Sequence, residues 1–217
     1  MLLNYNPPTQ PAFTIIYQDD DLIVLDKPSG LLTVPGKAPE HKDSLEKRVQ
    51  RVFPTATIVH RLDMATSGLL LMALNKPAHR EISRQFQHRE TSKKYIARIY
   101  GHPEQTSGSI ELPLICDWPN RPKQMVDFER GKHALTHWQV IESEDNATRV
   151  ELTPVTGRSH QLRVHMQQLG HPILGDRLYA TGDALAAAPR LQLHAMELAV
   201  THPVSQQRLA FEAPCPF

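Results

Sequence analysis

The stretch IVHRLDMATSGLLLMAL, residues 58–74, decides the fold and raises the first question about function. It ends in the apolar run 69–74, which is typical of a strand buried in a core. Arg61 and Asp63 precede that strand, and their spacing places both side chains on one side of an extended chain. Because a carboxylate beside an apolar interior is costly unless it is paired or used, the two residues indicate either a structural ion pair or part of a site.

The composition is that of an ordinary folded protein. The 217 residues are 40% hydrophobic and 22% charged, which argues against disorder and allows one substantial domain or two small ones. The longest apolar run is too short to cross a bilayer, and the start MLLNYNPPTQP lacks the pattern of a secretory signal. The chain has only two cysteines, Cys116 and Cys215, so we expect no disulfide scaffold and take the cytoplasm as the default location.

The charge is distributed unevenly along a nearly neutral chain. The formal net charge is +1, which does not indicate a general polycation. Residues 76–98 nevertheless hold seven Lys or Arg against two Glu. This segment is either a solvated helix face or a local surface that binds phosphate.

The predicted strands outnumber the predicted helices. We expect strands at 22–25, 69–74, 94–100, 134–142, 148–155, 195–201 and 207–212, with short strand-like pieces at 110–115. We expect helices at 43–52, from an Asn75 cap to about Phe86, and at 159–169 with Ser159 as the cap. Because strands and helices do not alternate regularly, the pattern favours an α+β fold with a mixed or antiparallel sheet.

A second polar cluster lies in residues 156–165, TGRSHQLRVH, where a glycine-containing turn leads into a helix. The polar face of that helix is predicted to present His160, Arg163 and Gln167. An arginine can hold a buried carboxylate in its ionised form through a two-pronged contact. An ionised and oriented carboxylate can act as a nucleophile or as a general base.

Several other kinds of site find no support in the sequence. The twelve histidines do not form the helical His-x-x-x-His pattern with an adjoining acid, so no metal site is expected. The glycine-rich motifs Gly-x-x-x-x-Gly-Lys-Ser/Thr and Gly-x-Gly-x-x-Gly do not occur, so no phosphate-binding loop for a nucleotide cofactor is apparent. Ser67 lacks the Gly-x-Ser-x-Gly setting of a hydrolase nucleophile.

Tyr95 follows two lysines at the start of a strand, where it either packs on the core or stacks on a base.

Four ordered segments together resemble the signature of the RluA-type RNA pseudouridine synthase family. They are DKPSGLL at 26–32, HRLD at 60–63 with its continuation, KKYIARIYG at 93–101, and TGRSHQLRVHMQQLGHPILGD at 156–176. The resemblance extends from about residue 15 to the C-terminus. Outside these segments, NYNPPTQP at 4–11 and LPLICDWPNRPKQ at 112–124 resemble a short member of the family that acts on both ribosomal and transfer RNA.

The resemblance implies a fold and a function. We expect a single catalytic domain over residues 1–217, with a mixed, mostly antiparallel central sheet, flanking helices, a central active-site cleft and no separate N-terminal RNA-binding module. The expected activity is the isomerisation of specific uridines to pseudouridine in structured RNA, namely large-subunit ribosomal RNA and a transfer-RNA anticodon stem-loop. The reaction requires no cofactor, and the expected partner is RNA, with no membrane and no obligatory protein partner.

The resemblance also assigns catalytic roles to Asp63, Tyr95 and Arg163. Asp63 corresponds to the catalytic aspartate, Tyr95 to a tyrosine that stacks on the uracil and assists proton removal at C5, and Arg163 to the residue that pairs with the aspartate. Whether Asp63 attacks C1′, attacks C6 or removes a proton at C2′ stays open. Arg61 is expected to enter the space left by the extruded nucleotide. The other candidate substrate and RNA contacts are His60, Leu162, Arg80, Arg84, Lys93, Lys94, Arg121 and Lys123.

The basic segment 76–98 also allows a second hypothesis, a non-catalytic RNA-binding or ribosome-assembly factor that uses the same groove. Such a protein would bind RNA and leave no pseudouridine in it. A third hypothesis, a His/Asp metallohydrolase, would show an activity that chelation removes.

Overall fold

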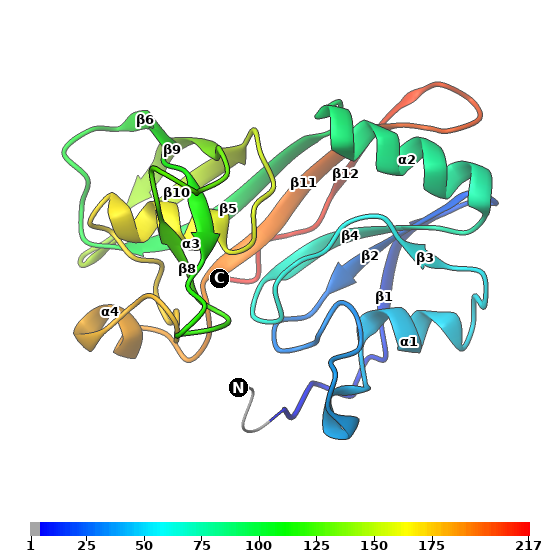
Figure 1. The fold of residues 1–217 in the computed structure, drawn as a ribbon, viewed down its shortest axis with the longest axis horizontal. Helices are drawn as coiled ribbons and strands as arrows, with labels where there is room; N and C mark the ends of the chain where they lie inside the picture. Colours follow the sequence, from blue (N-terminus) through cyan, green and yellow to red (C-terminus); the bar gives the residue numbers. More distant parts are fainter. Residues whose placement is uncertain (1–4) are drawn as a thin grey trace. The chain divides into compact units, whose positions relative to one another are not determined.

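The structure is a computed structural model, and it describes residues 5–217 (Figure 1). Residues 1–4, which include the first residue of the NYNPPTQP segment, lie outside the described residues. The described chain divides into two compact units, the terminal unit of residues 5–93 and 195–216 and the central unit of residues 94–194 with Phe217. The expected single catalytic domain stays a prediction.

The terminal unit is built on antiparallel strand pairs. Its strands are β1 (Thr14–Gln18), β2 (Leu22–Lys27), β3 (Thr57–Ile58), β4 (Ser67–Ala73), β11 (Leu193–Thr201) and β12 (Arg208–Glu212). Its helices are η1 (Pro39–His41), α1 (Leu45–Gln50) and α2 (Lys76–His88). The main strand order is β1-β2-β4-β11, while β3 pairs with β4 and β12 pairs with β11.

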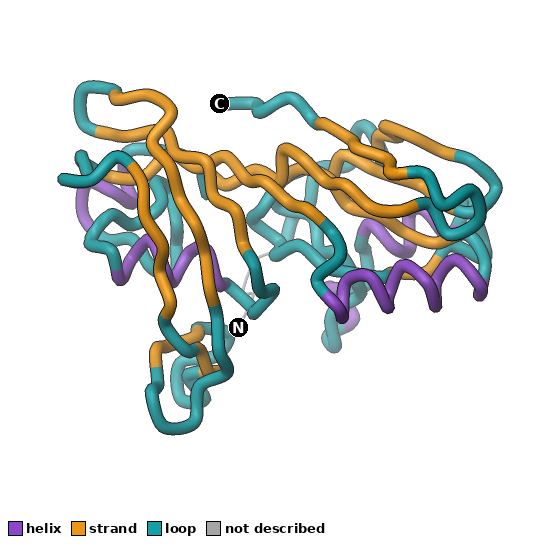
Figure 2. Tube along the Cα trace, turned by 90° about the horizontal axis from the view of Figure 1, so that it is seen from above, coloured by secondary structure: helices purple, strands orange, loops and turns teal. Residues whose placement is uncertain are grey.

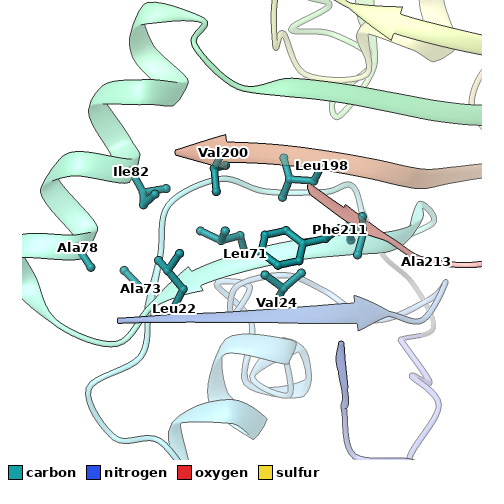
Figure 3. Close-up of a cluster of buried hydrophobic side chains, with 11 residues drawn as sticks. Leu22, Val24, Leu71, Ala73, Ala78, Ile82, Leu198, Val200, Phe211 and Ala213 are labelled. Atoms are coloured by element: carbon teal, nitrogen blue, oxygen red, sulfur yellow. The ribbon is translucent and has the colours of Figure 1, made fainter. Parts of the chain in front are cut away.

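Strand β4 is the centre of this unit, and all seven of its residues are buried. Gly68 has a φ of +110°, and a Cβ atom there would lie 2.3 Å from the carbonyl oxygen of Ala195. Only glycine therefore allows the backbones of β4 and β11 to approach this closely. Figure 3 shows Leu71 of β4 among the apolar side chains of this core, which also include Ile82 of α2.

Helix α2 forms as its sequence predicts. The side chain of Asn75 accepts a hydrogen bond from Ala78 N at 2.9 Å, and Pro77 occupies the first turn. Arg89 ends the helix in the left-handed conformation. Ala78 and Ile82 are buried on the face that packs against the core (Figure 3).

The central unit contains an antiparallel sheet and a separate hairpin. Its strands are β5 (Ser92–Tyr100), β6 (Ser107–Glu111), β7 (Leu114–Cys116), β8 (Gln124–Val126), β9 (Leu135–Ser143) and β10 (Ala147–Pro154), and its helices are α3 (Gln161–Gln168) and α4 (Gly182–Ala186). The sheet order is β5-β10-β9-β6, and Figure 2 shows these strands side by side. Strands β7 and β8 pair only with each other. Helix α3 covers one face of the sheet through hydrogen bonds to Thr136 of β9.

The α+β class with mostly antiparallel pairing is confirmed, but two local predictions are wrong. Ser159 does not cap α3, because His160 occupies the cap position in the left-handed conformation, with φ at 54°. The helix predicted over 43–52 ends at Gln50, which leaves Val52 60% exposed. None of the helices within residues 5–217 combines the length and the hydropathy needed to cross a membrane.

Candidate functional site

Asp63 lies in a tight turn directly before β4. Thr66 N donates to the backbone carbonyl of Asp63 at 3.1 Å, which closes the turn. Thr33 Oγ1 donates to the carbonyl of Leu62 at 2.7 Å and accepts from Leu62 N at 3.3 Å. Leu62 is therefore held by the Thr33 side chain and Asp63 by its own carbonyl, so the half-buried Asp63 lies on a fixed backbone.

The DKPSGLL segment at 26–32 holds the same turn through hydrogen bonds. Ser29 Oγ donates to the carbonyl of Ala65 at 2.7 Å, and Gly30 N donates to the carbonyl of Met64 at 2.8 Å. The two sequence segments that resemble the family are thus joined by hydrogen bonds within the terminal unit. These bonds restrain the backbone of residues 64 and 65.

Lys27 of the same segment also holds the turn, and its side chain has no exposed surface. Its Nζ donates to three backbone carbonyls, those of Pro28, Leu31 and Met64, at 2.9, 2.8 and 3.1 Å. Burial lowers the pKa of Lys27 to about 7, and the nearby carboxylates of Asp63 and Asp26 oppose this shift. Three carbonyl acceptors match the three N–H bonds of an ammonium, so Lys27 can supply a positive charge near Asp63.

A Lys27→Met variant should unfold about 3 kcal/mol more easily than the wild type, because three carbonyl oxygens lose the donor that the fully buried lysine supplies. Urea denaturation at pH 7 measures this loss. Lys37→Met is the matched control, since Lys37 is exposed, and it should leave stability unchanged. Equal stability of Lys27→Met and Lys37→Met would contradict the anchoring role of Lys27.

The pH dependence of stability tests the same residue. The folded-state pKa of Lys27 is lowered to about 7, whereas the unfolded chain keeps the ordinary value of 10.5. Between these values the unfolded state binds more protons, so the free energy of unfolding rises with pH. The wild type should therefore gain stability relative to Lys27→Met as the pH rises from 7 towards 9.5 in urea titrations. A difference that does not change over this range would show that the buried amine keeps its ordinary pKa.

His60 has a structural role in the terminal unit. Its Nε2 accepts a hydrogen bond from Leu71 N at 2.9 Å, and its ring stacks on Phe86 at 4.6 Å. Burial, together with the charge of Lys93, lowers the pKa of His60 to about 3. The neutral ring has its Nε2 engaged within the fold, and an RNA contact through His60 stays a prediction. Arg61, the next residue, is exposed.

The basic segment 76–98 contains cations in different environments. Arg84 forms ion pairs with Glu81 and Glu90 at 2.7 and 2.8 Å, so it is less suited to phosphate than expected. Arg80 is exposed on the same helix. Burial, and then the charge of Arg89, lowers the pKa of Lys93. In the central unit Lys94 lies 3.4 Å from Glu151.

Arg163 of α3 is only 4% exposed, although the sequence predicted it on a polar helix face. Its Nε and Nη2 donate to the two carboxylate oxygens of Asp176 at 2.8 and 2.7 Å. Asp176 is wholly buried, and this two-pronged pair offsets the cost of removing both charges from water. Asp176 is not among the predicted site residues, and its only signal in the sequence is its position at the end of the fourth family segment.

Tyr95 lies on the face of the central sheet that α3 covers. It pairs with Leu152 of β10, which pairs in turn with Trp138 of β9. Paired residues of antiparallel strands point to the same face, and Thr136, two residues before Trp138, binds α3. The half-buried Tyr95 and the buried Leu162 of α3 are therefore on the same side of this sheet.

Arg121 and Lys123 lie in the loop of the β7–β8 hairpin, within the central unit. Trp118 of that loop is 64% exposed, and the Arg121 guanidinium lies 4.4 Å from the centre of its ring. At the base of the loop, Gln124 N donates to the hydroxyl of Tyr179 at 2.8 Å. An exposed aromatic ring beside cations is typical of surfaces that stack on unpaired bases. The two cations are among the predicted RNA contacts, whereas Trp118 is not.

One cluster within residues 5–217, formed by Asp19, Asp21 and His202, has side chains close enough to hold a metal ion. His202 Nδ1 accepts hydrogen bonds from Val204 N and Ser205 N, at 3.2 and 3.0 Å. The proton of the neutral ring is therefore on Nε2, which donates to Asp19 at 2.9 Å. A protonated nitrogen cannot bind a metal, so this geometry fits an internal hydrogen-bonded network.

The two units carry different candidate catalytic groups. The terminal unit holds a carboxylate, Asp63, on a rigid turn above a buried lysine. The central unit holds an oriented guanidinium, Arg163, and a tyrosine on the same side of its sheet. A fixed carboxylate suits proton transfer or nucleophilic attack, and a half-buried tyrosine ring suits stacking on a base.

Comparison with known proteins gives one consistent family. A sequence model of the family described as RNA pseudouridylate synthase matches residues 21–168. The chain is 59% identical over 215 residues to the dual-specificity RNA pseudouridine synthase RluA of Escherichia coli (strain K12), covering 99% of this chain and 98% of that protein. It is 54% identical over 217 residues to the protein of the same name from Pasteurella multocida (strain Pm70), covering 100% and 99%.

Solved structures agree with this result. Human RNA pseudouridylate synthase domain containing 1 matches with a TM-score of 0.81 at 30% identity, covering 98% of this chain and 87% of that chain. Human RNA pseudouridylate synthase domain containing 4 matches with a TM-score of 0.76 at 25% identity, covering 94% and 88%.

Proposed function

This chain belongs to the RNA pseudouridylate synthase family and is an RNA pseudouridine synthase, and we propose that Asp63, Tyr95 and Arg163 catalyse its isomerisation of uridine. The observation that supports this assignment most is the rigid turn that carries Asp63, since it lies within the family match and is fixed by a second family segment. A carboxylate placed so firmly is suited to reaction with a bound nucleotide. The hypothesis of a non-catalytic RNA-binding factor finds no support among the relatives.

The reaction breaks the N1–C1′ bond of uridine and forms a C5–C1′ bond with the same uracil. The proton on C5 is lost and N1 gains one, so the change is redox-neutral and balanced without a co-reactant. The target nucleotide must leave the base stack for its C1′ and C6 to become accessible. Asp63 then attacks C1′, attacks C6, or removes a proton at C2′, and all three routes use its ionised form.

Tyr95 and Arg163 have supporting tasks in this proposal. The ring of Tyr95 stacks on the uracil and holds it while the base turns, and its hydroxyl assists the removal of the C5 proton. Arg163 is the proposed partner of the Asp63 carboxylate. Arg61, which is exposed, fills the position of the extruded nucleotide.

We propose that the substrates are large-subunit ribosomal RNA and a transfer-RNA anticodon stem-loop, because the relatives from Escherichia coli and Pasteurella multocida are named dual-specificity enzymes. The loop of the β7–β8 hairpin supports RNA binding through Trp118, Arg121 and Lys123. We also propose that residues 1–217 act as a single catalytic domain in the cytoplasm, where these RNAs are found.

The test of the function uses the purified chain and two unmodified transcripts, an anticodon stem-loop and a ribosomal RNA fragment. Pseudouridine is detected by carbodiimide modification and primer extension. The proposal expects pseudouridine at discrete positions in both RNAs without added metal or nucleotide. A chain that binds both RNAs and modifies neither would refute it, and modification of only one would refute dual specificity.

A Trp118→Ala variant should bind the stem-loop roughly tenfold more weakly, because stacking of a base on an aromatic ring contributes about 1–3 kcal/mol. Filter binding measures the dissociation constant. Val204→Ala, at another exposed apolar residue, is the matched control and should bind normally. Normal binding by both variants would exclude the Trp118 ring as a stacking platform.

A further inference from the structure

Asp176 is a wholly buried carboxylate whose described contacts converge on one cation and one turn. Its two oxygens accept from Nε and Nη2 of Arg163 at 2.8 and 2.7 Å. One of these oxygens also accepts from Leu178 N at 2.9 Å and from Tyr179 N at 3.3 Å. The two backbone bonds fix the carboxylate, and the fixed carboxylate fixes the plane of the Arg163 guanidinium.

Tyr179 gives the guanidinium a second support. The Cζ atom of Arg163 lies 5.1 Å from the centre of the Tyr179 ring. The hydroxyl of Tyr179 is held in turn, because it lies 2.6 Å from His160 Nδ1 and accepts from Gln124 N at 2.8 Å. The guanidinium of Arg163 is therefore restrained in its own plane by Asp176 and perpendicular to that plane by the Tyr179 ring.

A contribution to folding does not by itself explain this arrangement. Well-packed apolar residues often replace a buried ion pair without loss of stability, because the pair must offset the desolvation of both charges. The contacts specify a direction for the guanidinium, which matters when the cation must face a reacting group. A displacement of about 1 Å in such a group can lower a rate by roughly a hundredfold.

We propose that Asp176 is a positioning residue, which holds the Arg163 guanidinium in the orientation that pseudouridine formation requires, with Tyr179 supporting it from the ring face. The inference rests on the proposed catalytic role of Arg163. Asp176 itself does not contact the uridine. Its effect is therefore on the rate of the chemical step and not on RNA affinity.

The test compares Asp176→Glu with Asp176→Asn. Glutamate keeps the ion pair but moves the carboxylate by one methylene, so the protein should fold, while the single-turnover rate falls roughly a hundredfold and the RNA dissociation constant stays at the wild-type value. Asparagine removes the charge and should lower the rate at least as much, with a lower melting temperature. If Asp176→Asn does not fold, Asp176→Glu carries the test alone.

Asp43→Glu is the matched control, because Asp43 also holds a buried arginine, Arg48, through two hydrogen bonds, at 2.9 and 2.5 Å. It should retain the wild-type rate. A folded Asp176→Glu that reacts at the wild-type rate, or one whose rate and affinity fall together, would overturn the positioning role. The wild type is measured in parallel to separate the two proposals. A wild type that forms no pseudouridine contradicts the proposed function, whereas an active wild type leaves the variants to test the role of Asp176.

Discussion

An Asp63→Asn variant is expected to form no detectable pseudouridine while it folds normally and binds RNA with wild-type affinity. The amide cannot act as a nucleophile or as a base at neutral pH, so each of the three possible routes is blocked. Described hydrogen bonds hold the turn through backbone atoms and through the side chains of Thr33 and Ser29. Because asparagine has the same shape as aspartate, the turn should persist.

The measurement combines pseudouridine mapping, filter binding and the melting temperature of the variant. Asp20→Asn, at an exposed aspartate of the same unit, is the control and should be fully active. An Asp63→Asn variant that converts RNA at the wild-type rate would remove Asp63 from the chemistry. Loss of binding together with activity would instead make Asp63 an RNA contact.

The second large effect is expected for Tyr95→Phe. Phenylalanine keeps the ring that stacks on the uracil but removes the hydroxyl that assists proton transfer at C5. General acid–base catalysis typically contributes between about a hundredfold and ten-thousandfold, so the single-turnover rate should fall by at least about a hundredfold. RNA affinity should not change, because the stacking surface is kept.

Tyr100→Phe is a suitable control, because Tyr100 is a half-buried tyrosine on the same strand, β5. It should react at the wild-type rate. A Tyr95→Phe variant with full activity would limit Tyr95 to stacking, and Tyr95→Leu would then be the variant that loses activity. Full activity in both variants would exclude Tyr95 from the site.

The sequence predicts those helices and strands that have a clear local pattern, such as an apolar run or a helix cap. The buried run before Leu74 predicted β4, and the Asn75 cap with Ala78 and Ile82 predicted α2. Strand β1 was missed because it has no alternation: Ile15 and Ile16 are adjacent and both are more than a third exposed. Ser159 was chosen as a cap on residue preference, but the chain enters α3 through a left-handed His160.

The sequence predicts those site residues that lie in a recognisable family segment with a known role. It does not predict residues whose role depends on contacts between distant parts of the chain. Asp63 and Tyr95 followed from the resemblance. The role of Lys27 did not, because a lysine in a sequence indicates a surface position, and only the fold reveals its burial. Asp176 lies thirteen residues after Arg163, and no periodicity connects a helix residue to a carboxylate in the following loop.

The close approach of Gly68 to Ala195 has a consequence for how the protein forms during synthesis. The terminal unit is discontinuous, and its sheet needs a strand that leaves the ribosome only after the whole central unit has been made. The central unit, which is nearly continuous, can fold first. Until β11 is made, β4 lacks one of its neighbouring strands and its apolar side chains stay partly exposed. Such long-range closure is slow, so we expect the terminal unit to be completed only after its last strands emerge.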